Sequence, residues 1–240
     1  MNEKGERAVD RRILLLSVGL VAMLAVVNAT VFTYRWLTGT VLVYGPEAAA
    51  VHGCVGFYST MHDGVPRDLL PSVGTNYNAP ILGTGATVMV TRGDVVCQIR
   101  ESITEEEVYY YYLYESISAV FNVTVGSWYI QDFYGFGYYA ESRTARNPIY
   151  VYLRVESTDM SYVATNATLI VFKYDKTTGQ WVYAASLNLL SQGAMTTAIE
   201  LPVNSSLRLD LYIDAYATGT GTFKVGFYVT PEAGETPAPP

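Results

Sequence analysis

The sequence is poor in the residues on which most enzymes rely. It has two histidines, His52 and His62, two cysteines, and no Gly-x-Ser-x-Gly motif. A serine nucleophile needs a positioned base, and glycosidic chemistry needs two carboxylates that face each other across a cleft. The acidic residues 105–107 form a solvated run, and Asp210 and Asp214 are expected to point outward to solvent from one strand, so neither set indicates a cleft. We predict no catalytic residues, no cofactor and no enzymatic activity.

Metal-ligating residues are equally sparse. The nearest approach to a cluster is formed by His52, Cys54, His62 and Asp63. Histidine and thiolate bind soft and borderline metals, but Cys54 has an alternative partner in Cys97. No D-x-D-x-D-G calcium-binding loop is present. The sequence therefore predicts no metal site.

Positive charge is scarce as well. After residue 29 the chain has only three lysines, Lys173, Lys176 and Lys224, and the net charge of the full sequence is −7. An acidic surface repels phosphate backbones, and binding to nucleic acid depends on basic contacts. We expect no nucleic-acid partner.

One apolar run stands out in residues 13–27, ILLLSVGLVAMLAVV. A potential cleavage site lies after Ala29. Val27, the last residue of the run, and Ala29 provide the small or apolar residues at positions −3 and −1 of that site. Four basic residues precede the run: Lys4, Arg7, Arg11 and Arg12. This order of charge, apolar core and small residues is typical of a secretory signal peptide, so we predict a leader at residues 1–29.

Export places the rest of the chain in the extracellular space, at the cell surface. The apolar run is shorter than the roughly 20 residues that span a bilayer as a helix, and contact with the membrane is expected only through the leader before cleavage. Two alternatives stay open, an uncleaved N-terminal anchor and a leader of the type IV pilin kind.

An extracellular location also changes how the cysteines and asparagines are interpreted. Cys54 and Cys97 are predicted to form a disulfide, which contributes roughly 3–4 kcal/mol in the loop-entropy view; two free buried thiols are the alternative. Asn-x-Ser/Thr sequons after the leader predict glycosylation, although such triplets also arise by chance in a chain rich in threonine. The sequons begin at Asn122, Asn166 and Asn204.

Beyond the leader, the pattern is that of β-strands. Apolar and polar residues alternate along 149–156, 207–216 and 222–229, which favours strands with one buried face. Residues 169–187 read as a hairpin turned between Asp175 and Gly179. Short strands are also expected near 53–59, 86–90 and 94–99, a long surface loop over 62–80, and a strand from residue 108. The 21 tyrosines suit half-exposed sheet faces and also interfaces between subunits.

These elements predict an all-β fold, a jelly-roll-like β-sandwich that follows an N-terminal signal peptide. The expected organisation is a leader at 1–29, an N-terminal strand at 30–44, a sandwich domain at 45–229 and a flexible Pro-rich tail at 230–240.

The N-terminal strand has an unusual place, because cleavage after Ala29 would leave it at the free end of the chain. Residues 30–44, TVFTYRWLTGTVLVY, alternate with period two. Such a strand either joins its own sheet or fills an open sheet edge in a neighbouring subunit. For the second case we predict that the even-numbered side chains are the inserted anchors: Phe32, Tyr34, Trp36 and Leu42.

The leader followed at once by ATVFTYRWLTGTVLV, together with the C-terminal stretch AIELPVNSSLRLDLYIDAYATGTGTFKVGFYV, resembles fibre subunits of the TasA/camelysin type and the related archaeal bundling pili. The resemblance covers most of the mature chain and is one of pattern, without a short defining motif. It implies a jelly-roll domain whose N-terminal segment inserts into the next subunit, and a homopolymer that grows head to tail.

Three classes of function therefore stand side by side. A filament subunit requires residues 30–44 for assembly. A membrane-anchored cell-surface glycoprotein or binding module keeps its leader and is a soluble monomer without it. An exported hydrolase depends on one or two polar residues, and the sequence offers no pair to nominate. We favour the extracellular filament.

Overall fold

Alternating apolar residues build the strands of this molecule, and β9 (Ile149–Thr158) shows how. Val151, Leu153 and Val155 are fully buried, while Glu156 is partly exposed. The computed structural model describes residues 33–37, 53–76, 80–81, 86–102, 108–140 and 147–234. All of these belong to one compact unit, Phe32–Pro240.

The described residues form fourteen strands and one short 3₁₀ helix. Besides β9 these are β1 (Thr33–Leu37), β2 (Cys54–Tyr58), β3 (Pro80–Ile81), β4 (Ala86–Arg92), β5 (Val95–Ser102), β6 (Val108–Tyr114), β7 (Ser116–Val123), β8 (Gly126–Tyr139), η1 (Met160–Tyr162), β10 (Ala164–Asp175), β11 (Gln180–Asn188), β12 (Ile199–Leu201), β13 (Ser205–Ala215) and β14 (Phe223–Thr230).

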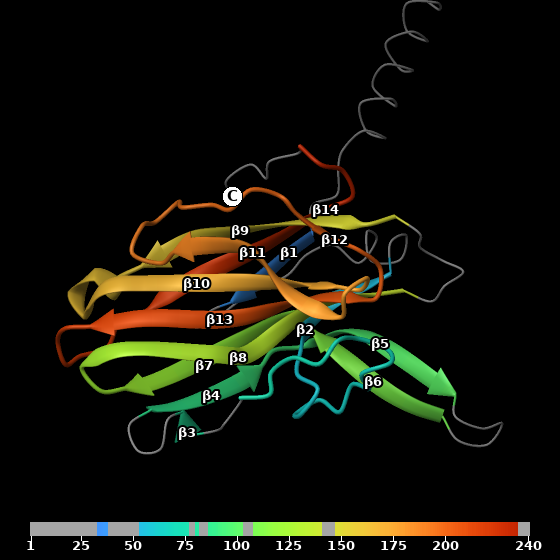
Figure 1. Cartoon of the computed structure of the whole chain (residues 1–240), viewed down its shortest axis with the longest axis horizontal. Helices are drawn as coiled ribbons and strands as arrows, with labels where there is room; N and C mark the ends of the chain where they lie inside the picture. The colour runs from blue at the N-terminus through green and yellow to red at the C-terminus, as the bar shows by residue number, and fades with distance from the viewer. Residues whose placement is uncertain are drawn as a thin grey trace, which may run out of the picture. The chain divides into compact units, whose positions relative to one another are not determined.

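The strands form two sheets of seven strands each (Figure 1). Sheet A has the order β12-β9-β14-β1-β7-β4-β3, and sheet B has the order β11-β10-β13-β8-β2-β6-β5. Almost all neighbours are antiparallel; the exception is the pair of β1 and β7, which is parallel. The all-β sandwich predicted from the sequence is therefore confirmed.

The main core lies between the two sheets and takes residues from both. Its centre is an aromatic cluster of Phe57 from β2, Phe136 from β8 and Phe227 from β14. The Phe57 ring lies 5.1 Å from Phe136 and 4.9 Å from Phe227, with edge-to-face geometry in both pairs. Edge-to-face aromatic pairs add to the stabilisation from burial alone, so this cluster joins sheet B to sheet A.

Most of the predicted elements lie where the pattern places them. β10 and β11 form the hairpin expected over 169–187, and its turn is closed by a hydrogen bond from the Gly179 amide to the Asp175 carbonyl at 2.8 Å. Gly179 has a φ of 68°, a conformation that glycine adopts at no steric cost. The strand predicted from residue 108 is two strands, because the chain crosses from sheet B to sheet A at Glu115.

The expected surface loop is more than a connection. Residues 59–76 pack on the outer face of sheet B and form a second apolar cluster with it. Leu70 and Val73 of this loop are buried against Tyr58 and Leu113. Gly135 allows the close approach, since a Cβ atom there would lie 2.2 Å from the Val73 side chain. The alternation of β13 and β8 did not reveal this cover, because it comes from a segment far away in the sequence.

The predicted disulfide between Cys54 and Cys97 is present, with the two Cα atoms 5.8 Å apart. It joins the start of β2 to β5, two strands away in sheet B. The hairpin of β5 and β6 is otherwise joined to β2 by a single strand-pairing position, Phe57 with Tyr114. The disulfide therefore fastens an outer hairpin to the body of the sheet.

In the described part of the chain, no helix is long and apolar enough to cross a membrane.

Replacing both cysteines by serine should lower the free energy of unfolding by roughly 3–4 kcal/mol, because the unfolded chain regains the freedom that the closed loop removes. Urea unfolding of the double variant and of the unchanged protein, both without reductant, measures the difference. Unfolding of the unchanged protein in dithiothreitol is the matched control and should show the same loss. Equal midpoints for variant and unchanged protein would contradict the prediction.

Candidate functional site: a strand slot in sheet A

The N-terminal strand β1 lies in the middle of sheet A. It pairs antiparallel with β14 over its five residues, from Thr33 opposite Val229 to Leu37 opposite Val225. On its other side it pairs parallel with β7, where Trp36 lies opposite Ser116 and Leu37 opposite Ile117. β14 and β7 are thus held in one sheet by a strand that comes from the start of the chain, and we call the space between them the strand slot.

β1 fills only part of this slot. β7 continues through Val123, six residues beyond Ile117. Over that stretch β7 pairs with β4 on one side, and no described strand pairs with it on the side that faces β14. An interrupted ladder in the middle of a sheet is a ready template for another strand.

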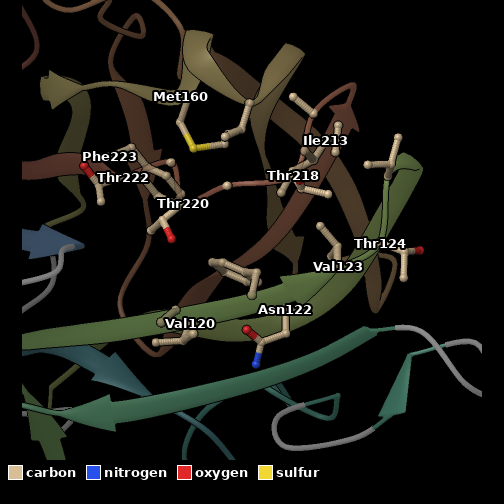
Figure 2. A pocket seen from close by; sticks show the side chains of 18 of the residues that line it. Val120, Asn122, Val123, Thr124, Met160, Ile213, Thr218, Thr220, Thr222 and Phe223 are labelled. Atoms are coloured by element: carbon tan, nitrogen blue, oxygen red, sulfur yellow. The ribbon is translucent and has the colours of Figure 1, made fainter.

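An apolar groove of about 700 Å³ lies along this open stretch. One wall is β7 from Ser118 onward, and the other is the loop 217–222 with Phe223 at the start of β14. Met160 and Val163, at and just after η1, and Ile213, near the end of β13, close the side toward sheet B. Figure 2 shows these side chains around the groove, with Val123 on one wall and Phe223 on the other.

The floor of the groove is aromatic. The Phe121 ring of β7 is stacked on Phe223 of β14 with 6.4 Å between ring centroids, and it meets Phe133 of β8 edge to face at 5.0 Å. Phe121 and Phe223 therefore meet although their strands do not pair here. The groove therefore ends in a packed aromatic floor.

The predicted anchors can be placed only in part. Phe32 and Leu42 lie outside the described residues. Tyr34 is opposite Tyr228 in the register of β1, and Trp36 is opposite Gly226. The side chains of β1 are not among those described, so the assignment of these four residues as inserted anchors stays a prediction.

A second feature, a polar network, lies on the outer face of sheet B. The sequence predicts that the polar side chains of this face are exposed to solvent. Asp210 of β13 is fully buried. Its carboxylate accepts hydrogen bonds from the Arg208 guanidinium at 3.0 Å, the Tyr129 hydroxyl at 2.5 Å and the Asp132 amide at 2.8 Å. Burial, and then the bond to Asp210, raise the pKa of Tyr129 to about 12.

Asp132 continues this network into the loop 59–76. Its carboxylate accepts hydrogen bonds from the Gly74 amide at 2.8 Å and from the Thr75 amide and hydroxyl. Burial raises the pKa of the Asp132 carboxyl, and the bonds from Thr75 and Gly74 oppose the rise. Asp132 lies at a register shift of β8 and has a φ of 51°. No periodicity in the sequence announces such a bulge.

Asp63 fastens the beginning of the same loop. Its carboxylate accepts hydrogen bonds from the Ser59 amide at 2.7 Å, Arg92 at 2.6 Å and the Tyr134 hydroxyl at 2.9 Å. Asp63 and Asp132 thus hold the loop against the sheet, which gives both a structural use. His52, the other member of the weak metal group, lies outside the described residues. Among those that are described, no group of three or more His, Cys, Asp or Glu is placed to hold a metal ion.

The three sequons differ in their surroundings. Asn122 of β7 and Asn166 of β10 are exposed. Asn204 is partly buried with a φ of 53°, and its side-chain oxygen accepts a hydrogen bond from the Ala140 amide at 2.9 Å. Ser206, the hydroxyl residue of that sequon, is fully buried and bonded to Tyr58.

We expect a glycan on Asn166 and none on Asn204, because only the former presents both its amide and its hydroxyl residue, Thr168, at the surface of the folded domain. Glycopeptide mass spectrometry of protein isolated from its own host measures this, with Asn166→Gln as the control that removes the modified peptide. A glycan found on Asn204 would contradict the prediction.

These features define a β-sandwich protein in which one sheet includes its own N-terminal strand and in which no other described strand pairs with β7 beyond Ile117 on that side. The chain matches no known protein-family model, and no curated protein matches its sequence. The function therefore has to be inferred from the strand slot itself.

Proposed function

We propose that the protein is the structural subunit of an extracellular filament that assembles head to tail, each subunit placing its N-terminal strand in the strand slot of the next. The observation that supports this most directly is the position of β1. A terminal strand that lies between β14 and β7 makes the sheet continuous, and any copy of the strand satisfies the same backbone groups.

The geometry suits exchange between copies. β1 has five residues, and its connection to β2, residues 38–53, is long enough to carry the strand away from its own body. Exchange of a terminal element between identical chains is a low-cost route to assembly, because the contacts within each sheet are unchanged. The contact is heterologous, since strand and slot are different surfaces, and it propagates wherever the rotation between subunits does not close a ring.

This proposal includes three further parts. They are a jelly-roll order of the strands, secretion of the chain through the leader 1–29, and kinship with fibre subunits of the TasA/camelysin type and archaeal bundling pili. The two-sheet architecture and the disulfide are compatible with an extracellular subunit.

Negative-stain electron microscopy of residues 30–240 tests the function, with a protein that begins at Pro46 as the control. We expect filaments from the longer protein only, because the shorter one has no strand to donate. Monodisperse particles from both proteins would contradict the proposal and favour a membrane-anchored surface glycoprotein or binding module.

A further inference from the structure

The direction of β1 bears on what fills the rest of the slot. β1 runs parallel to β7, so the chain after Leu37 leaves in the direction of Val123. In Figure 2 the arrowhead of β1, in blue, points toward the space between β7 and the loop 217–222. The groove therefore lies on the line that a continued β1 would follow.

The register of that continuation is fixed by the pairs already present. Leu37 lies opposite Ile117, whose side chain belongs to the core between the sheets. If the pairing continues in the same register, three odd-numbered residues lie beside the three core-facing residues of β7 that follow Ile117. These pairs are Gly39 with Ala119, Val41 with Phe121, and Val43 with Val123.

The composition of this segment suits the groove. Residues 38–44 read TGTVLVY, without a charged residue. Of the odd-numbered positions, Gly39 is small, and Val41 and Val43 are β-branched residues that favour strands. A glycine at the first position and two valines after it match a groove whose floor is already filled by the rings of Phe121 and Phe223.

The length of the chain limits how far its own segment can follow the groove. A strand that followed the groove to Tyr44 would end beside Thr124, next to the start of β8 at Gly126. Gly53 lies at the other end of β8, against the backbone of Tyr139. β8 has 14 residues, so its ends are roughly 40 Å apart at about 3.3 Å per residue.

The residues between Tyr44 and Gly53 cannot cover that distance. Fully extended, 45–52 reach about 30 Å, and they must also cross from sheet A to sheet B, which lie about 10 Å apart. A chain that follows the groove to its end is therefore unable to return to its own Gly53. A second copy has no such restriction, because its body is free to lie beyond the end of the groove.

We propose that the groove is occupied by residues 38–44 of a second copy of this chain, which continue that copy's β1 parallel to β7 with Gly39, Val41 and Val43 facing the core. This assignment rests on the proposed exchange of N-terminal strands, and it adds the segment, the direction and the register. It also makes the contact between subunits more than twice as long as β1 alone.

Paired cysteines test the register and the origin of the segment together. Val43→Cys with Val123→Cys, introduced into residues 30–240, places two thiols at facing positions, within the range that a disulfide requires. After mild oxidation, a non-reducing gel should show a ladder of covalent multimers. The matched control, Leu42→Cys with Val123→Cys, moves one thiol to the opposite face and should give no ladder. In this register Leu42, which the sequence predicts as an anchor, faces away from the core, so the control also tests that prediction. Gly39→Cys with Ala119→Cys is a second facing pair, in case the first prevents folding.

The outcomes separate this assignment from the proposed function. Filaments in the microscope without a ladder from either facing pair would overturn the assignment and leave the filament standing. A cross-link within single chains would overturn it as well, since the groove would then hold the protein's own segment. Neither filaments nor a ladder would remove both proposals, and a ladder from the Leu42 pair alone would show that the register is wrong.

Discussion

A protein that begins at Pro46 should bind a synthetic peptide of residues 30–44 and be stabilised by it. Without β1, sheet A has a gap between β14 and β7, and the backbone groups on both sides lose their partners. A peptide that fills the gap binds the folded protein and not the unfolded chain. At a hundred times its dissociation constant it adds about 2.7 kcal/mol of stability. For a domain of this size that corresponds to a rise of about 5–10 °C in Tm.

Thermal unfolding over a series of peptide concentrations measures this effect. The matched control is the same peptide with Tyr34→Pro and Trp36→Pro, because proline has no amide hydrogen to donate to a neighbouring strand. The control peptide should leave the Tm unchanged. If the unaltered peptide also has no effect on a folded protein, β1 does not complete the sheet in the way proposed.

Replacing Asp210 by alanine should lower the free energy of unfolding by about 3–5 kcal/mol. The Asp210 carboxylate is fully buried, and its partner Arg208 has a side chain that is 12% exposed. Removing one member of a buried ion pair leaves the other charge without compensation. The Tyr129 hydroxyl and the Asp132 amide lose an acceptor at the same time.

Asp214→Ala is the matched control, because it removes a carboxylate from the same strand and the same face. Asp214 lies near the solvent-exposed end of β13 and is bonded to the Tyr212 hydroxyl at 2.7 Å. The control should unfold at nearly the same denaturant concentration as the unchanged protein. Equal losses for both variants would mean that the burial of Asp210 and its bonds have no energetic role. Chemical denaturation monitored by tryptophan fluorescence is the measurement.

These two aspartates show what the sequence was able to predict. Alternation along 207–216 placed a strand there and assigned its apolar side chains to the core, and Leu207, Leu209 and Leu211 are indeed buried. The same alternation assigned Asp210 and Asp214 alike to solvent. Alternation reports the two faces of one strand and is silent on whether a distant segment, here 59–76, covers the outer face.

The strand slot was predictable to a similar degree. Period-two alternation gave a strand over residues that include 33–37, and that this strand becomes terminal on cleavage of the predicted leader stays a prediction. Which strands flank it was not readable, because pairing between residues near 35, 117 and 227 is long-range and depends on the whole sheet order. The groove beyond Leu37 arises from the different lengths of β1 and β7, and a single strand pattern carries no information on its neighbour's length.

The position of β1 also determines how the molecule bears force. A pull on the N-terminal end of β1 acts along the strand, and the hydrogen bonds to β14 and β7 run across it. All of these bonds are loaded at the same moment, in shear, and none of them opens before the others. A strand pulled from its side would instead lose its bonds one after another. The N-terminal end of β1 is thus oriented to resist tension along the axis of the strand.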